Sequence, residues 1–203
     1  MKKVAIIGTH GVGKTTLCKA LAEVAKDHGK QTECVGEVVR ECPYLLNHNM
    51  GYEALEWTSL EQIARERKAE RANPDLIICD RSVYDPYVYF KQTFSASRTS
   101  VQHDILSSSL RVFLFHYLQT YDKIFLVGRT SAVIEDDGFR DLDKKFHREV
   151  DEAFQQMFHG KRNATKLDSE YYEEVAYSDV YVDSCQIFHN TNGLAEELYE
   201  CIF

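Results

Sequence analysis

The sequence predicts an α/β domain with a mostly five-stranded parallel sheet and helices on both faces. Short, fully apolar segments alternate along the chain with longer segments of helical periodicity, which is the pattern of strands joined by crossover helices. Strands without a polar face are typical of parallel sheets that are covered on both sides. The chain has 203 residues, whereas chains usually divide into domains only above about 250–300 residues. We therefore expect one domain over residues 1–203.

Five segments are expected to form the strands. Most are short and rich in apolar or β-branched residues, so that they suit the interior of a sheet. In chain order they are Val4–Ile7, residues 32–38, Leu76–Cys79, Lys123–Val127 and Gln186–Phe188.

Five longer segments show helical periodicity. The first is residues 15–28, directly after the loop that follows the first strand. The second runs from Thr58 to Asn73, where Ser59 and Gln62 would form a capping box at its start. The remaining helices are expected over residues 101–118, over roughly 141–159, and from about Leu194 to the C-terminus.

Charge and cysteine content limit the classes of function. The chain has 24 basic and 32 acidic residues, for a net charge of −8. A protein that wraps a duplex carries a basic surface, so long nucleic acid is not an expected partner, although one pocket could still hold a small anion. No apolar run reaches the ~18–20 residues of a membrane span. The six cysteines form no CxxC pair, which argues against a zinc ribbon and for a reduced, cytoplasmic setting.

A phosphate-binding loop follows the first predicted strand. Residues 8–15, GTHGVGKT, match GxxxxGK[ST] between a strand and a helix. The glycines let successive backbone N–H groups surround a β-phosphate, Lys14 supplies a cation, and the Thr15 hydroxyl can ligate Mg²⁺. His10 is expected to face solvent. The motif predicts a P-loop fold that binds ATP and Mg²⁺, with contacts from Gly8, Gly11, Val12, Gly13, Lys14, Thr15 and Thr16.

Charged residues follow the ends of the later strands. They are Glu37 at the end of the second strand, Asp80 and Arg81 after the third, and Arg129 and Arg140 around the loop after the fourth. Ligands bind at the carboxyl ends of the strands in open parallel sheets, so these groups should meet beside the P-loop. A carboxylate there can organise Mg²⁺ or accept a proton, and arginines can stabilise a phosphoryl group in transfer. The combination favours a kinase, with Asp80 and Thr15 at the metal.

Residues 79–90, CDRSVYDPYVYF, resemble the [DE]RS-containing stretch of deoxynucleoside kinases, and the Asp-Arg pair also resembles that of thymidylate kinases. The resemblance implies transfer of the γ-phosphoryl of ATP to a nucleoside or nucleoside monophosphate. It implies that Glu37 deprotonates the acceptor hydroxyl and that Arg81 lies near the phosphates and the 5′ end of the acceptor. The Glu-Pro pair that follows the second strand in this family is absent, because Val38 replaces the proline.

The resemblance also implies a lid and an adenine contact. Kinases of this superfamily close an arginine-bearing lid over the triphosphate, which corresponds to residues 129–141 with Arg129 and Arg140, although the family's closely spaced arginines are missing. Residues 189–193, HNTNG, resemble the loop that contacts adenine in nucleotide kinases, which assigns Asn190 to the base. The catalytic residues expected in this way are Lys14, Glu37, Asp80, Arg81 and Arg140.

The segment 40–60 is expected to line the acceptor pocket. Arg40 could hold an acceptor monophosphate, whereas pairing of Arg40 with Glu37 or Glu41 would favour a nucleoside. Trp57 could stack on a base, although a core or interface role fits it as well. The residues expected at the acceptor are Glu37, Arg40, Trp57, Arg81 and Tyr84. A homodimer is also compatible with the sequence.

Other P-loop classes are disfavoured. A regulatory GTPase would need Asn-Lys-x-Asp and Asp-x-x-Gly motifs, and here Asp80 is followed by Arg-Ser-Val. An ABC- or AAA-type mechanical ATPase would need a longer apolar strand that ends in Asp-Glu, which is absent. A polynucleotide end kinase and a kinase for another small metabolite remain as alternatives, and the acidic net charge counts against the first.

Overall fold

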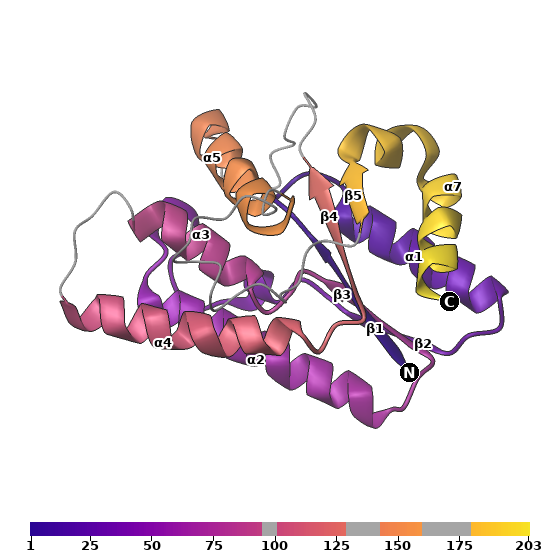
Figure 1. Cartoon of the computed structure of the whole chain (residues 1–203), viewed down its shortest axis with the longest axis horizontal. Helices are drawn as coiled ribbons and strands as arrows, with labels where there is room; N and C mark the ends of the chain where they lie inside the picture. The colour runs from indigo at the N-terminus through magenta and orange to yellow at the C-terminus, as the bar shows by residue number, and fades with distance from the viewer. Residues whose placement is uncertain (95–100, 129–142, 160–179) are drawn as a thin grey trace.

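Five strands form one sheet in the order β2-β3-β1-β4-β5, and each neighbouring pair is parallel (Figure 1). The computed structural model of the chain describes residues 1–94, 101–128, 143–159 and 180–203. The strands are β1 (Lys2–Ile7), β2 (Thr32–Val35), β3 (Leu76–Asp80), β4 (Lys123–Gly128) and β5 (Val180–Asp183). The predicted fold class, an α/β domain with a five-stranded parallel sheet, is confirmed.

Helices cover both faces of this sheet (Figure 1). They are α1 (Lys14–Asp27), α2 (Tyr52–Arg71), α3 (Asp85–Phe94), α4 (Val101–Leu118), α5 (Lys144–Phe154) and α7 (Ser184–Ile202). Three short turns complete the described elements: η1 (Val38–Glu41), η2 (Asn47–Asn49) and the π-helical η3 (Gln155–His159).

The core has two layers because successive strand residues point to opposite faces. In β1, Val4 and Ile6 pack with the apolar side chains of α1 and α7. Ala5 and Ile7 of the same strand pack with those of α2, α3, α4 and α5. All four are fully buried, which explains why this strand has no polar face in the sequence.

The register of the central strands places the functional loops side by side. Ile6 of β1 lies opposite Asp80 at the end of β3, and Ile7 lies opposite Leu126 of β4. The P-loop therefore leaves the sheet beside the residues that follow β3. This edge is the carboxyl edge of the parallel sheet, where the sequence predicts the site.

Several predicted elements have other bounds in the structure. Strand β2 ends at Val35 and not at residue 38, and α7 begins at Ser184 and not at Leu194. Helix α2 begins at Tyr52, and Ser59 is buried inside it, so that the capping box expected with Gln62 does not form. The earlier start buries Ala54 and Leu55 against the sheet, which extends the apolar stripe by almost two turns. The strand expected at Gln186–Phe188 is helical, part of α7, and the last strand lies earlier, at Val180–Asp183. Helix α3 was not predicted.

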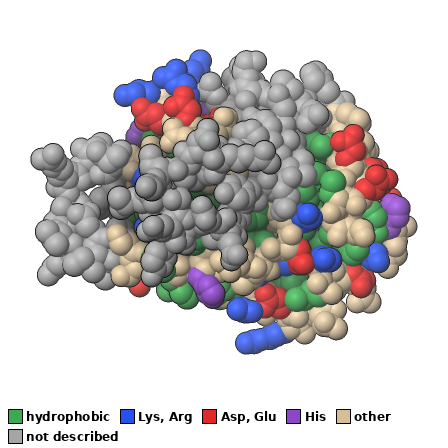
Figure 2. All heavy atoms as spheres, in the orientation of Figure 1, with side chains coloured by type: hydrophobic (Ala, Val, Ile, Leu, Met, Phe, Trp, Pro, Cys, Tyr) green, Lys and Arg blue, Asp and Glu red, His purple; other side chains and the backbone are tan. Residues whose placement is uncertain are grey.

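The described surface is mixed in charge. Figure 2 shows acidic and basic side chains interspersed over the described part of the face that it displays. Among the helices that the structure describes, none combines the length and the apolar character needed to cross a membrane.

Candidate active site

Glycine is required in the loop after β1. Gly8, Gly11 and Gly13 all have positive φ, at 136°, 75° and 90°. A Cβ atom on Gly8 would lie 2.3 Å from the carbonyl oxygen of Val127, so that the loop passes against the end of β4 with no room for a side chain. This close approach carries the chain directly into the N-terminus of α1, where backbone N–H groups can receive an anion.

Lys14 is the first residue of α1, and its side chain is only 5% exposed. Its Nζ donates to the carbonyl oxygen of Thr9 over 2.6 Å. Burial, followed by the nearby Arg81 guanidinium, lowers the pKa of Lys14 to about 8, while Asp80 and Glu37 oppose this shift. The ammonium group is therefore charged at neutral pH and lies in a partly desolvated pocket, where a bound phosphate would neutralise its charge.

Thr15 and Asp80 form the position expected for the metal. The Thr15 hydroxyl donates to Oδ2 of Asp80 over 2.5 Å. Oδ1 of Asp80 is buried and has no hydrogen-bond partner among the described residues. No group of three or more His, Cys, Asp or Glu side chains in the described part of the chain is placed to hold a metal. Mg²⁺ commonly takes one or two protein oxygens together with substrate phosphates, so Thr15 and Asp80 fit this ion.

Glu37 lies at the end of the segment after β2 and accepts from two arginines. Its Oε1 is 2.7 Å from Nη2 and 2.8 Å from Nε of Arg81, and its Oε2 accepts from Nε of Arg40 over 2.7 Å. Burial opposes ionisation of this carboxyl, but Arg81 and Lys14, with the hydrogen bonds from Arg81 and Arg40, hold its pKa well below the usual range. Glu37 is thus a carboxylate at any pH near neutrality.

Arg81 connects this acid to the P-loop. Besides Glu37, its Nη1 reaches the carbonyl oxygen of Gly8 at 3.4 Å and Oδ2 of Asp85 at 3.5 Å. Asp85 is fully buried and accepts from the backbone N–H and the hydroxyl of Ser82, at 2.9 and 2.7 Å. Burial raises the pKa of Asp85, and Arg81 opposes this effect. The guanidinium is therefore balanced by two carboxylates.

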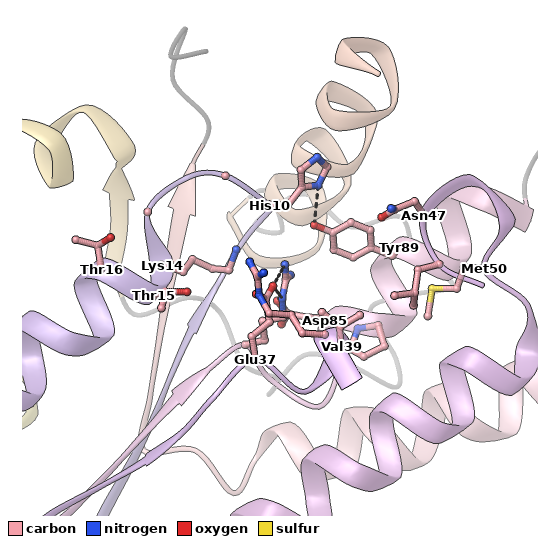
Figure 3. A pocket seen from close by; sticks show the side chains of 16 residues that line it. His10, Lys14, Thr15, Thr16, Glu37, Val39, Asn47, Met50, Asp85 and Tyr89 are labelled. Atoms are coloured by element: carbon pink, nitrogen blue, oxygen red, sulfur yellow. Dashed lines mark hydrogen bonds and ion pairs between the residues drawn. The ribbon is translucent and has the colours of Figure 1, made fainter. Parts of the chain in front are cut away.

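One pocket is lined by Lys14, Thr15, Glu37, Arg81 and Asp85 (Figure 3). Figure 3 shows Lys14 and Thr15 at one end, Asn47 and Met50 at the other, and Glu37 between them. The phosphate-binding end is lined by His10, Gly11, Gly13, Lys14, Thr15 and Thr16. The remaining lining residues are Glu37, Val39, Arg40, Leu46, Asn47, Met50, Arg81, Asp85, Pro86 and Tyr89. The pocket thus has a phosphate end, a charged centre and a largely apolar far end.

Most of the predicted site residues come together here, but several do not. Trp57 is half-buried on α2 and does not line the pocket, and Tyr84 is buried against Tyr87, Phe115 and Phe158 in the core. The structure therefore gives no support to stacking by Trp57 or to acceptor contact by Tyr84. The side chain of Val12 packs in the core, and the expected contact of its backbone with a phosphate stays a prediction.

The nucleotide contacts expected beyond the P-loop are not tested. Asn190 lies at a kink inside α7, with φ −153° and ψ 61°, and its Oδ1 accepts from the backbone N–H of Gly193. It does not line the pocket, and its contact with adenine stays a prediction. Arg129, Arg140 and the lid at 129–141 lie outside the described residues.

His10 and Tyr89 are pocket residues that the sequence analysis missed. His10 is only 7% exposed and not solvent-facing as expected: its Nδ1 is 3.3 Å from the Tyr89 hydroxyl. Its carbonyl oxygen accepts from Nε2 of His147 over 2.7 Å, which ties α5 to the P-loop. The spacing of four residues from Asp85 to Tyr89 could have indicated that both share one face of a helix. Helix α3 provides that face.

The comparisons with known proteins agree with this architecture. The family described as AAA domain matches residues 3–174. The name AAA is also that of the AAA-type mechanical ATPases, a class that the sequence disfavours. A structure of deoxyadenosine kinase from M. mycoides with bound dATP has a TM-score of 0.62 and 17% sequence identity, and covers 98% of this chain and 100% of that chain. A structure of the same kinase with bound dCTP has a TM-score of 0.57 and 16% sequence identity, with the same coverage of both chains.

No curated protein matches the chain in sequence. Identities of 16–17% show a shared fold and not a shared reaction. The chain therefore belongs to the family described as AAA domain, and it has a P-loop fold like that of a nucleoside kinase.

Proposed function

We propose that this chain is an ATP-dependent phosphotransferase that moves the γ-phosphoryl group to a hydroxyl of a nucleoside. The observation that carries the proposal is the ion pair of Glu37 with Arg81, at 2.7 Å, between the two ends of one pocket. On one side lies the P-loop with Lys14. On the other side the apolar far end offers a slot for a planar base. A phosphoryl donor and a hydroxyl acceptor can therefore meet at the charged centre.

The charge balance favours a nucleoside over a monophosphate. Among the described residues, two arginines line the pocket, Arg40 and Arg81. Both donate to the Glu37 carboxylate, and Arg81 also pairs with Asp85. An acceptor phosphate would have to displace a carboxylate from one of these cations. A neutral hydroxyl can instead donate to a remaining lone pair of Glu37 without breaking either pair. Pairing of Arg40 with Glu37 is the pattern that was expected from the sequence to favour a nucleoside.

Glu37 is the base in this proposal. It is ionised at neutral pH, so it can accept the hydroxyl hydrogen bond at once. Its proton affinity is low while both arginines hold it, which suits late proton transfer: in a loose phosphoryl-transfer transition state the hydroxyl becomes acidic only as its bond to phosphorus forms. Arg81, between Gly8 and Glu37, is placed to stabilise charge on the group in transfer.

Lys14, Thr15 and Asp80 would act on the nucleotide. Lys14 would contact the β- and γ-phosphates, as its burial beside the P-loop backbone suggests. Thr15 and Asp80 would hold Mg²⁺, which when bound neutralises phosphate charge and orients the triphosphate. Adenine binding by Asn190 and closure by Arg129 and Arg140 are part of the same proposal and rest on the resemblance alone.

The decisive experiment incubates the purified protein with ATP and Mg²⁺ against nucleosides, nucleoside monophosphates and an oligonucleotide with a free 5′ hydroxyl. A nucleoside monophosphate that forms from a nucleoside supports the proposal. Product from the monophosphates alone, or from the oligonucleotide alone, would instead identify a nucleotide kinase or a polynucleotide end kinase. Phosphate release that no acceptor increases would indicate an ATPase and refute phosphotransfer.

With the best acceptor, Glu37→Gln tests the base directly. The amide keeps the size of the side chain but cannot take the proton, so kcat should fall by roughly 10²–10⁴-fold while the acceptor KM changes little. Glu41→Gln is the matched control, because Glu41 is an exposed acid four residues later that pairs with Arg65 outside the pocket. A main effect on acceptor KM would point to an acceptor that is already ionised.

A further inference from the structure

A buried polar network contacts the backbone that carries Arg81, and the mechanism above does not use it. Its members are Lys3 on β1, Gln62 and Glu66 on α2, and Tyr121 just before β4. All four side chains are less than a tenth exposed, and none lines the pocket. Buried polar groups are costly unless they are satisfied, so a closed network of this kind needs a reason.

Glu66 is the centre of the network and is fully buried. Its Oε1 accepts from the Tyr121 hydroxyl over 2.6 Å and from the Gln62 amide over 2.9 Å. Its Oε2 is paired with Nζ of Lys3 at 3.1 Å. Lys3 also reaches Glu70 at 3.1 Å and lies 4.8 Å from the ring centre of Tyr121. The carboxylate thus fixes the directions of the tyrosine hydroxyl and the glutamine amide.

Both of these groups also bond the loop after β3. Nε2 of Gln62 donates to the carbonyl oxygen of Arg81 at 3.3 Å. The backbone N–H of Val83 donates to the Tyr121 hydroxyl at 3.1 Å. The N–H of Arg81 itself donates to the carbonyl oxygen of Ile6 over 3.0 Å. The backbone of the loop is therefore held at Arg81 on both sides of its Cα atom and again two residues later.

Arg81 needs such support because its φ is +90°, in the region that favours glycine. A residue with a side chain is strained there and keeps this conformation only where its surroundings impose it. This conformation accompanies the position from which the guanidinium reaches both Gly8 and Glu37. Relaxation of the backbone would turn the side chain away from at least one of them.

We infer that Gln62 and Tyr121 are positioning residues that hold Arg81 in its strained conformation, and that Glu66 and Lys3 orient them. The network acts on the reaction through Arg81 and touches neither substrate. Its effect on activity rests on the proposed function, whereas its effect on the loop does not.

The test compares Tyr121→Phe with Tyr117→Phe. Tyr117 is the matched control because it is buried beside the same lysine, with its ring centre 5.0 Å from Nζ of Lys3. Its hydroxyl has no hydrogen-bond partner among the described residues. NMR hydrogen exchange at the Val83 amide and at the Nε–H of Arg81 reports on the loop and on the Glu37 pair. Both should exchange about tenfold faster in Tyr121→Phe, which corresponds to the loss of one hydrogen bond of ordinary net strength. Tyr117→Phe should match the wild type.

Gln62→Met gives a second variant, should Tyr121→Phe fold poorly. It removes the donor to Arg81 with little change in volume, and faster exchange is expected at the Arg81 Nε–H. In both test variants kcat should fall by roughly tenfold while the ATP KM stays within about twofold, because Arg81 acts most on the transition state. If the network had a purely structural role, the changes in kcat and in the ATP KM would be the same in these variants as in Tyr117→Phe.

Equal exchange at both sites in Tyr121→Phe and Tyr117→Phe would overturn the inference, as would equal losses of kcat in the two variants. If the wild type transfers phosphate to no acceptor, the proposed function fails, and the two exchange measurements still decide whether the network holds Arg81.

Discussion

The hydroxyl of Thr15 donates to Oδ2 of Asp80 over 2.5 Å and so joins the first turn of α1 to the end of β3. The two residues are 65 positions apart in the sequence, and the parallel pairing of β1 with β3 brings them together. The same pairing sets Arg81 beside Gly8. One strand register therefore aligns the groups that would meet the metal with the group that would meet the transferred phosphoryl.

Asp80→Asn should weaken the use of Mg²⁺. The amide retains the hydrogen bond to Thr15 but removes the negative charge and one buried acceptor oxygen. We expect the Mg²⁺ concentration for half-maximal activity to rise by roughly ten- to a hundredfold, the usual effect of losing a partner around a metal. ATP binding measured without Mg²⁺ should change little. Asp75→Asn, at an exposed acid before β3, is the control, and equal behaviour of the two variants would contradict a metal role for Asp80.

ATP affinity should fall as the pH rises through about 8, the pKa of Lys14 in the free protein. Below this pH the ammonium group is charged and attracts the phosphates; above it the free protein must first take up a proton to bind. The loss can reach tenfold for each pH unit, until the pKa of the bound form is passed. Calorimetric titration with a non-hydrolysable ATP analogue at several pH values measures it.

Lys14→Met should remove this pH dependence and abolish phosphotransfer without loss of the fold. Lys19→Met, at an exposed lysine of the same helix, should retain both. An unchanged alkaline loss of affinity in Lys14→Met would assign the titration to another group.

The stability cost of alanine should increase in the order Gly36, Gly29, Gly8. A Cβ on Gly36 or Gly29 meets no atom within 4 Å, but Gly29 has a φ of +72°. We expect little change for Gly36→Ala and about 1 kcal/mol for Gly29→Ala. For Gly8→Ala, the contact at 2.3 Å with the Val127 carbonyl oxygen should cost about 3 kcal/mol or more. Denaturant unfolding measures all three, and a cost for Gly8→Ala no larger than that for Gly29→Ala would refute the close packing of the P-loop on β4.

Glu37 should stay ionised at a lower pH than an ordinary glutamate, whose pKa is 4.5. Its depressed pKa stabilises the folded state above the unfolded-state pKa, and this contribution is lost as the pH falls. Arg81→Gln should raise the pKa of Glu37 strongly, because burial then favours the neutral acid. Arg40→Gln should raise it less, since the bond from Arg40 contributes least. Carbon-detected NMR titration of the side-chain carboxyl checks this order, which the reverse result would contradict.

The parts of the site that follow from local sequence were predictable. The P-loop and the start of α1 depend on contiguous residues with demanding geometry, and Asp80 and Arg81 follow an apolar strand whose neighbours in the sheet are set by general rules. The Glu37 position follows in the same way from the end of β2. What a side chain pairs with did not follow, and the double pairing of Glu37 needed the structure.

The far end of the pocket depends on tertiary placement. Residues 36–51 are mostly irregular, and nothing local indicates that Asn47 and Met50, but not Tyr44, turn toward the pocket. Trp57 was a candidate for base stacking because residues 40–60 were expected to line the acceptor pocket, with the helix starting only at Thr58. The helix starts at Tyr52, so Trp57 lies on it. The last strand was misplaced because Gln186–Phe188 and Val180–Asp183 are both very short, and the pairing with β4 is what identifies the second as the strand.

The lysine buried between Glu66 and Glu70 constrains how this protein can diverge. A single change of Lys3, Glu66 or Tyr121 leaves a buried charge or hydroxyl without its partner, which is far costlier than replacement of the whole set by apolar residues. Relatives should therefore keep these three residues together or replace them together, so that the three positions covary across an alignment. The residues of the exposed ion pairs of α2 should vary independently of one another.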